Sequence, residues 1–291
     1  MTLAFLGPEG AVADPSRARI HFIPVPFDAT TCYRPGARLG PSAILAASPH
    51  MEWYDEELDA EVWRLGLYTR PPLEPVLPPE AMIEAVRAAV SESLSVGAFP
   101  VVLGGEHSVT VGAVSALRER VGDLAVVQFD AHADLRENYQ GSPYSHACVM
   151  RRIWDSARVR QVGIRSLSRP EMEFLRAEGR PPIWAREVKA DCAGAVRRLL
   201  DGLPDIPVYV TIDLDCLDPA VMPAVGTPEP GGLSWDEILA FLRALAGTGR
   251  VAAFDVVELA PLPGLAAPEY TAARLVYKFL TYLFAPGPGR G

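Results

Sequence analysis

QFDAHADL, residues 128–135, runs from a short apolar segment into three polar residues at alternate positions, Asp130, His132 and Asp134. Side chains alternate between the two faces of an extended strand, so residues two apart point the same way. One strand end could therefore direct two carboxylates and an imidazole at a single point, as a metal site requires. Aspartate is also common in solvated turns after buried strands, so the rest of the sequence must decide between a site and an ordinary loop.

Strand and helix patterns alternate on both sides of this stretch. Apolar runs predict strands at residues 19–26, 99–103, 124–129, 160–164, 208–214 and 251–257. Helical periodicity with capping and breaking residues predicts helices at residues 41–47, 79–97, 109–120, 169–179, 191–202, 235–247 and 269–284. This order predicts an α/β fold with three layers, in which helices cover both faces of a central, mostly parallel sheet. Because no repeat or linker divides the chain, we expect one catalytic domain over residues 1–291.

The composition narrows the class of protein. The chain has 291 residues, of which 49% are hydrophobic, as is typical of a folded globular protein. Its net charge of -9 argues against binding to nucleic acid or to an anionic membrane, because both need clustered positive charge. A cytoplasmic location is expected, since there is no long apolar run, no basic leader and no close pair among the four cysteines. The scarcity of Lys and Asn fits a GC-rich genome and a heat-adapted protein equally well.

Polar residues follow four of the predicted strands. They are His107, the three residues of DAHAD named above, the pair Asp213 and Asp215, and Glu258. The carboxyl ends of parallel strands lie at one edge of a sheet, where ligands bind in open α/β folds, so these residues are expected to converge. Four aspartates with two neutral imidazoles carry a charge of about -4, which two divalent cations would balance. Oxygen and imidazole ligands suit Mn, Fe, Co, Ni or Zn, and two such ions can share and activate a hydroxide.

Four segments carry a resemblance to a known family. They are PFDATTCYRPGARLGP at 26–41, GGEHS at 104–108, DAHAD at 130–134 and TIDLDCLDP at 211–219. In this order they resemble the ureohydrolase family, which includes arginase, agmatinase and formimidoylglutamase. The resemblance implies a single α/β domain with a parallel sheet of about eight strands, and a binuclear centre with two Mn²⁺ per subunit. It also implies assembly as a homotrimer or homohexamer.

The resemblance also assigns roles to individual residues. One manganese would be held by His107, Asp130, Asp134 and Asp213, and the other by Asp130, His132, Asp213 and Asp215, so that Asp130 and Asp213 bridge the two ions. His146, in YSHACVMRR, matches the histidine of the family's site, and Glu258, in DVVELAP, matches its guanidinium-binding glutamate. Thr227, in GTPEPGG, matches a threonine position near the substrate.

The activity implied is hydrolysis of a guanidino group to urea and a primary amine. A hydroxide shared by the metal ions would attack the guanidinium carbon. Glu258 suits a guanidinium because a carboxylate can accept two of its N–H groups at once. Asp134 would relay a proton to the leaving amine, and His146 would carry protons at the mouth of the site, as an unperturbed imidazole can near neutral pH.

The loop LRENYQGSPYSHAC, residues 135–148, bears on the substrate. It departs from the arginase pattern, which holds an α-carboxylate, and like GIRS at 163–166 it is more similar to the agmatinase branch. The resemblance therefore implies a small cationic substrate, agmatine or N1-aminopropylagmatine, converted to urea and putrescine or spermidine in polyamine biosynthesis. Arg136 is unexpected beside such a cation unless it points outward or pairs with Glu137. Cys148 stands where a smaller residue is expected, which leaves the shape of the pocket open.

Other activities remain as alternatives. Within the family they are hydrolysis of arginine, guanidinobutyrate or formimidoylglutamate. Outside it, a two-metal hydrolase could act on a phosphoester or an amide, although Glu106 in the GGEHS turn would repel a phosphate. A non-catalytic relative acting as an interaction protein would have no reason to keep all six ligands.

Overall fold

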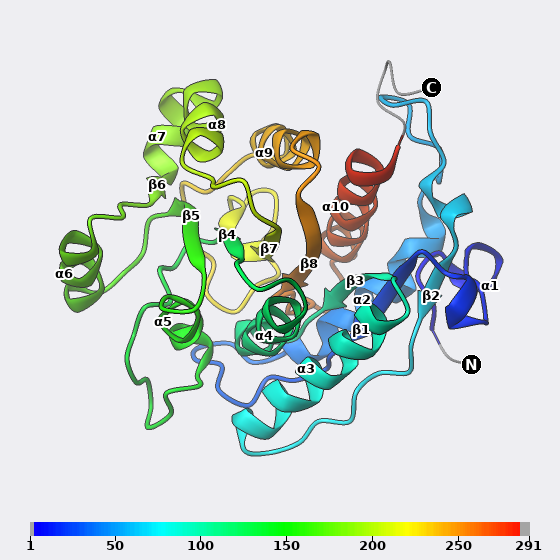
Figure 1. Ribbon diagram of the computed structural model, residues 1–291, viewed down its shortest axis with the longest axis horizontal. Coiled ribbons are helices and arrows are strands. Elements are labelled where there is room, and N and C mark those ends of the chain that lie inside the picture. Colours follow the sequence, from blue (N-terminus) through cyan, green and yellow to red (C-terminus); the bar gives the residue numbers. More distant parts are fainter. Residues whose placement is uncertain (1–2, 286–291) are drawn as a thin grey trace.

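One sheet of eight strands runs through the protein in a computed structural model that describes residues 3–285 (Figure 1). The strand order across the sheet is β2-β1-β3-β8-β7-β4-β5-β6, and every neighbouring pair is parallel. The strands are β1 (Ile20–Pro24), β2 (Leu67–Thr69), β3 (Phe99–Leu103), β4 (Ala125–Phe129), β5 (Arg158–Ile164), β6 (Ile183–Trp184), β7 (Val208–Asp213) and β8 (Val251–Val257). The prediction of a parallel sheet of about eight strands is confirmed.

Helices cover both faces of this sheet. They are α1 (Gly7–Gly10), α2 (Gly40–Ala47), α3 (Pro79–Ser95), α4 (Thr110–Val121), α5 (Val149–Ile153), α6 (Arg169–Glu178), α7 (Ala185–Ala190), α8 (Cys192–Asp201), α9 (Trp235–Gly247) and α10 (Ala267–Phe284). Buried side chains of α2, α8, α9 and α10 pack on one face, and those of α3, α4 and α5 pack on the other. Figure 1 shows α8, α9 and α10 on one side of the sheet and α3, α4 and α5 on the other, so the predicted three-layer architecture is confirmed.

Each strand feeds both halves of the core because its side chains alternate between the two faces. In β3, Val101 and Leu103 belong to the cluster under α2 and α10, whereas Val102 belongs to the cluster under α3 and α4. All five residues of β4 are buried. Burial on both faces explains why these strands appear in the sequence as continuous apolar runs.

The predicted helices and strands occur where expected, with ends that differ by a few residues. The strands at 99–103 and 251–257 match β3 and β8, and the capping box of Ser234 and Glu237 opens α9 as predicted. Five of the short helices and strands were not predicted: β2, β6, α1, α5 and α7. They have two to six residues and are too short for a periodic pattern.

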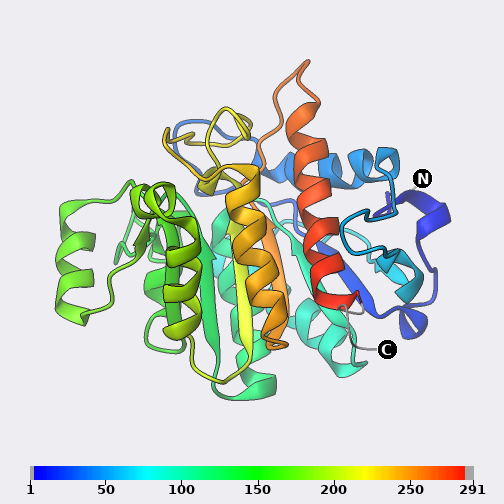
Figure 2. The same cartoon turned by 90° about the horizontal axis from the view of Figure 1, so that it is seen from above.

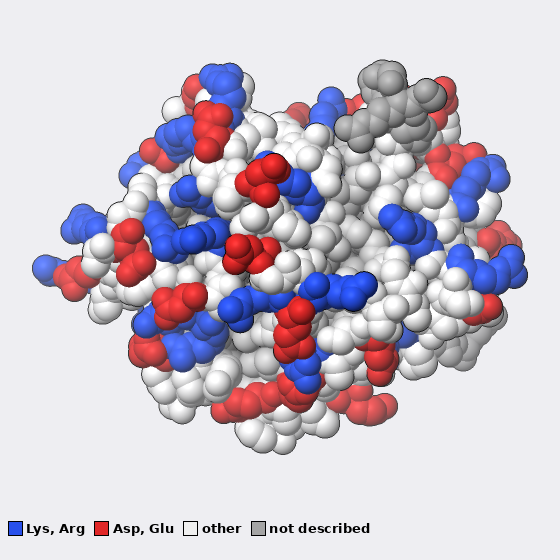
Figure 3. All heavy atoms as spheres, in the orientation of Figure 1, with Lys and Arg blue, Asp and Glu red and all other residues white. Residues whose placement is uncertain are grey.

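Loops after β1, β7 and β8 gather at one edge of the sheet, as Figure 2 shows in blue, yellow and orange. Because all strands are parallel, this edge is formed by their carboxyl ends. Among residues 3–285, no helix combines the length and the apolar character that crossing a membrane requires. On the face shown in Figure 3, acidic and basic side chains are interspersed.

Candidate active site

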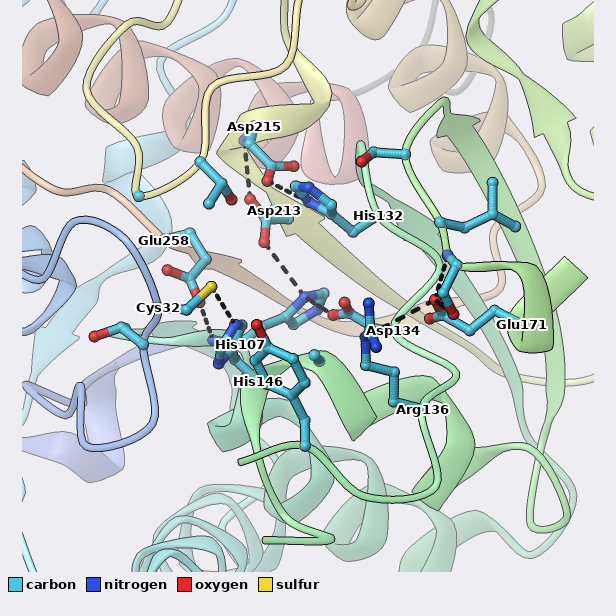
Figure 4. Close-up of a pocket in the computed structure, with 18 residues that line it drawn as sticks. Cys32, His107, His132, Asp134, Arg136, His146, Glu171, Asp213, Asp215 and Glu258 are labelled. Carbon is cyan, nitrogen blue, oxygen red and sulfur yellow. Dashed lines mark hydrogen bonds and ion pairs between the residues drawn. The ribbon is translucent and has the colours of Figure 1, made fainter. Parts of the chain in front are cut away.

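The four strands that end in predicted site residues are adjacent in the sheet. Their order is β3-β8-β7-β4, and their ends are in register, with Leu103 opposite Val256 and Phe129 opposite Ile212. The polar residues that follow these strands therefore meet at the centre of the carboxyl edge. Figure 4 shows the side chains of His107, Asp134, Asp213 and His132 directed toward one another.

The first group of possible ligands surrounds the buried imidazole of His107. Its Nδ1 atom lies 3.2 Å from Asp130 Oδ2, 3.0 Å from Asp134 Oδ2 and 3.4 Å from Asp213 Oδ2. The other ring nitrogen, Nε2, lies 2.9 Å from the hydroxyl of Thr211. This contact turns Nδ1 toward the three carboxylates.

The second group surrounds His132. Its Nδ1 atom lies 2.9 Å from Asp215 Oδ2 and 3.7 Å from Asp130 Oδ1. Asp130 belongs to both groups and presents one oxygen to each histidine. Asp213 faces His107, while its Oδ1 accepts a hydrogen bond of 2.9 Å from the backbone of Asp215.

The donor set fits two divalent cations. His107, Asp130 and Asp134 form one group with ligand atoms close enough to share an ion, and Asp130, His132 and Asp215 form another. His107 Nδ1 is buried and has no hydrogen-bond partner within residues 3–285, although three carboxylates surround it. A buried nitrogen of this kind needs a partner, and a metal ion would provide one.

Burial and neighbouring charges shift the pKa values of these groups. Burial, followed by the charge of Asp130, raises the pKa of Asp134 to about 7. Burial, followed by the charges of Asp215 and Asp130, raises the pKa of Asp213 well above its usual range. Burial opposes protonation of His132, but the carboxylates of Asp215 and Asp130 outweigh it and raise its pKa. The cluster therefore gains stability from added positive charge.

Glu258 lies at the end of β8 with a left-handed backbone, φ 66°. Its Oε1 accepts a hydrogen bond of 2.7 Å from the backbone N–H of His107, and its own N–H donates to the carbonyl of Gly105. Burial, followed by the charge of Glu106, raises the pKa of Glu258 to about 8. These contacts fix the carboxylate beside both groups of possible ligands.

His146 begins a short 3-10 helix after a polar loop. Its Nδ1 lies 3.3 Å from Thr30 Oγ1 and 3.2 Å from Ser145 Oγ, and its Nε2 lies 3.6 Å from Cys32 Sγ. Burial lowers the pKa of His146 to about 4, so the ring is neutral at pH 7. The expectation that it titrates near neutrality is wrong, because it rested on the pKa of an unburied imidazole.

A cavity of about 240 Å³ joins these side chains. Both histidines of the ligand groups, His146, Glu258 and the predicted Thr227 line it. Its wall also includes Arg136, which neither points fully outward nor pairs with Glu137: its guanidinium lies over the ring of Tyr139, with Glu171 4.0 Å away. Glu137 pairs instead with Arg151 and Arg152. Cys148 is fully buried and lies outside the cavity lining, so it does not shape the pocket directly.

A family model described as the arginase family matches residues 18–282. The chain belongs to the arginase family. The resemblance seen in the four motifs is thereby confirmed. The arginase family consists of binuclear metal enzymes, in agreement with the two groups of possible ligands.

Individual members of the arginase family are also similar over most of their length. The N(1)-aminopropylagmatine ureohydrolase of Synechocystis sp. is 39% identical over 280 residues, which cover 94% of this chain and 91% of that protein. The agmatinase of Pyrococcus horikoshii is 38% identical over 259 residues, with 87% and 88% covered. The solved structure of the agmatine ureohydrolase of Thermoplasma volcanium has a TM-score of 0.89 and 33% identity, and covers 97% of this chain and 94% of its own.

Several residues around this arginase-family site were not predicted. Gln128, inside the buried strand β4, donates to Asp130 Oδ2 at 2.6 Å, and Gln161 in turn donates to the side-chain oxygen of Gln128. Thr30 and Cys32 reach His146 from the loop after β1. An amide in an otherwise apolar strand was the available signal for Gln128, whereas nothing local in the sequence connects Thr30 with His146.

Proposed function

We propose that this protein is a binuclear metal ureohydrolase that converts agmatine or N1-aminopropylagmatine to urea and putrescine or spermidine. The observation that carries the proposal is the position of Glu258, whose buried carboxylate lines the same cavity as both groups of possible metal ligands. A carboxylate in that position suits a guanidinium ion, and the relatives named for agmatine-type substrates are 38–39% identical to this chain.

The proposed metal ligands are those given by the family resemblance. His107, Asp130, Asp134 and Asp213 would hold one Mn²⁺, and the same two bridging aspartates with His132 and Asp215 would hold the other. Oxygen and imidazole donors suit Mn²⁺. When bound, the two cations supply Lewis acidity that activates water for attack on the guanidinium carbon.

The protein's own residues then position the substrate and move protons. Glu258 accepts N–H groups of the guanidinium and holds its plane against the ligand groups. Water adds its oxygen to the central carbon, the bond from that carbon to the substituted nitrogen breaks, and the products are urea and an ammonium ion. Asp134 would pass a proton to the departing nitrogen, the role that the family resemblance gives it. Neutral His146 can accept a proton at the mouth of the cavity.

A second candidate substrate rests on Arg136. Its guanidinium forms part of the cavity wall, and a positive charge there favours a substrate tail that ends in a carboxylate, such as guanidinobutyrate or arginine. We rank this candidate second because the loop that carries Arg136 is more similar to the agmatinase branch.

Urea release tests both candidates. Purified, manganese-activated protein is offered agmatine, N1-aminopropylagmatine, arginine and guanidinobutyrate in parallel, and formimidoylglutamate is offered with formamide, its hydrolysis product, as the readout. The two agmatine compounds are expected to give the highest kcat/KM. A preference for arginine would show that the interpretation of residues 135–148 is wrong.

Assembly and location also belong to this proposal. We propose a homotrimer or homohexamer in the cytoplasm, with one domain over residues 1–291. Exposed Leu39 and Leu265 line a shallow apolar depression that a neighbouring subunit would cover. Sedimentation velocity would test the assembly, and a monomer at micromolar concentration would contradict it.

A further inference from the structure

Glu106 is neither a proposed metal ligand nor a proposed substrate contact, although its charge helps to raise the pKa of Glu258. Its fully buried carboxylate accepts three hydrogen bonds. The backbone N–H of Thr30 donates to Oε2 at 2.6 Å, and the hydroxyl of Thr30 donates to Oε1 at 2.7 Å. The third donor is the hydroxyl of Ser108, at 2.5 Å from Oε1. One carboxylate therefore binds both polar donors of a residue 76 positions earlier in the chain.

The backbone at Glu106 also hydrogen-bonds the loop after β1, which carries Thr30. The N–H of Glu106 donates to the carbonyl of Phe27 at 2.7 Å, and a Cβ atom at Gly105 would lie only 1.9 Å from that carbonyl oxygen. Only glycine permits so close an approach. The segment that leaves β1 is therefore pressed against the turn that follows β3, and Thr31 and Cys32 continue from it into the cavity wall.

Thr30 in turn contacts His146. Its Oγ1 accepts a hydrogen bond of 3.0 Å from the backbone N–H of His146 and lies 3.3 Å from the ring Nδ1. A threonine hydroxyl has one proton, and this one is donated to Glu106. Oγ1 can then only accept from the ring, and Ser145 Oγ, 3.2 Å from the same nitrogen, can accept as well, so the contact with Thr30 favours the tautomer of His146 with its proton on Nδ1. The other nitrogen, Nε2, which lies 3.6 Å from Cys32 Sγ, is then unprotonated and can accept a proton.

We propose that Glu106 is a positioning residue that acts through Thr30 on His146 and on the adjacent cavity wall. It keeps the Thr30 hydroxyl as an acceptor toward the ring, sets the tautomer of His146, and holds Thr31 and Cys32 in place. Glu106 itself does not touch the substrate. The kinetic part of the test rests on the proposed ureohydrolase activity, whereas the chemical part does not.

Two variants separate this role from simple support of the fold. Thr30→Val keeps the shape of the side chain but removes the hydroxyl, and Thr30→Ser restores it. Glu106→Gln keeps the size of the side chain but offers an N–H to the hydroxyl, which releases the hydroxyl proton toward His146 Nδ1. Thr248→Val is a matched control, because the Thr248 hydroxyl bonds nearby backbone groups, the carbonyl of Leu245 and the N–H of Arg250, at the opposite edge of the sheet.

The kinetic readout is urea release with bound manganese measured in the same samples. Thr30→Val and Glu106→Gln are expected to lower kcat by about tenfold to hundredfold, since they disturb one proton carrier. Thr30→Ser is expected to stay within about twofold of the wild type, as is Thr248→Val, and the manganese content of all four is expected to be unchanged. A wild-type kcat in a folded Thr30→Val or Glu106→Gln protein overturns the proposal.

The chemical readout is alkylation by iodoacetamide, followed by peptide mass spectrometry. Cys32 and Cys192 are both partly buried, and Cys192 lies in α8, away from the cavity. Thr30→Val is expected to raise the alkylation rate of Cys32 several-fold and to leave that of Cys192 unchanged, whereas Thr30→Ser changes neither. If the alkylation rate of Cys32 is unchanged in Thr30→Val, Thr30 does not hold this part of the cavity wall in place, and the proposal is overturned. This readout decides the inference even if the wild type releases no urea, an outcome that would refute the proposed function alone.

Discussion

Glu258 accepts a hydrogen bond of 2.7 Å from the backbone N–H of His107, and this contact joins the end of β8 to the end of β3. The hydrogen bond uses only Oε1 of Glu258, so the backbone of His107, a possible metal ligand, orients the carboxylate. The same carboxylate lines the cavity. This hydrogen bond explains how the proposed guanidinium-binding carboxylate and the group of possible metal ligands around His107 can share one small site.

Replacement of Glu258 by Gln tests this relation. The amide oxygen can still accept from His107, but the charge that pairs with a guanidinium is lost. We expect kcat/KM for agmatine to fall by at least about 100-fold, with bound manganese unchanged. Steady-state urea assays and metal analysis of the same preparation provide the measurement. Near-normal turnover with both ions bound would remove Glu258 from the mechanism.

The shared position of Asp130 predicts an unequal effect of two similar substitutions. Because Asp130 faces both histidines, Asp130→Asn is expected to weaken both ion sites. Asp215 belongs only to the group of His132, so Asp215→Asn is expected to leave one ion per chain after dialysis. Metal content measured by plasma mass spectrometry checks both. Two ions retained by Asp130→Asn would contradict a shared ligand.

The raised pKa of Glu258 predicts a pH dependence. Burial and Glu106, the two leading causes, hold this pKa at about 8, so the carboxyl group is largely protonated below that pH. A guanidinium ion needs the ionised form, and its affinity should therefore rise as pH increases toward about 8, by up to tenfold per unit, and then level off. Calorimetric titration of metal-free protein with guanidinium chloride between pH 6 and 9 measures this. The same series with Glu258→Gln should be flat, and an affinity that falls with increasing pH would refute the assignment.

The sequence-based predictions of strands and of their ends were correct where the pattern lay within a single strand. An apolar run that ends in acids at alternate positions, as at Asp130 and Asp134, indicates both the strand and the sheet edge at which its polar residues lie. Parallel pairing then brings together residues from distant parts of the chain without further information. By contrast, the link from Glu106 through Thr30 to His146 spans 116 positions and depends on how two irregular loops fold. The sequence also does not show how deeply His146 is buried, and this burial lowers its pKa to about 4.

Arg136 provides a test of substrate choice. Its positive charge in the cavity wall disfavours a cationic tail and favours an anionic one. Arg136→Gln is expected to raise the kcat/KM ratio of agmatine over guanidinobutyrate by about tenfold. Arg152→Gln is a suitable control, because Arg152 pairs with Glu137 and does not line the cavity. An unchanged ratio in Arg136→Gln would mean that this charge does not select the substrate.

The central claim is that two metal ions and the residues around them hydrolyse an agmatine-type guanidino group. Its most direct test is to titrate metal-stripped protein with Mn²⁺ and to measure urea release from agmatine and N1-aminopropylagmatine at each step. We predict that urea release appears with added Mn²⁺ and reaches its maximum at two ions per chain. Two bound ions with no urea from either compound would contradict the claim.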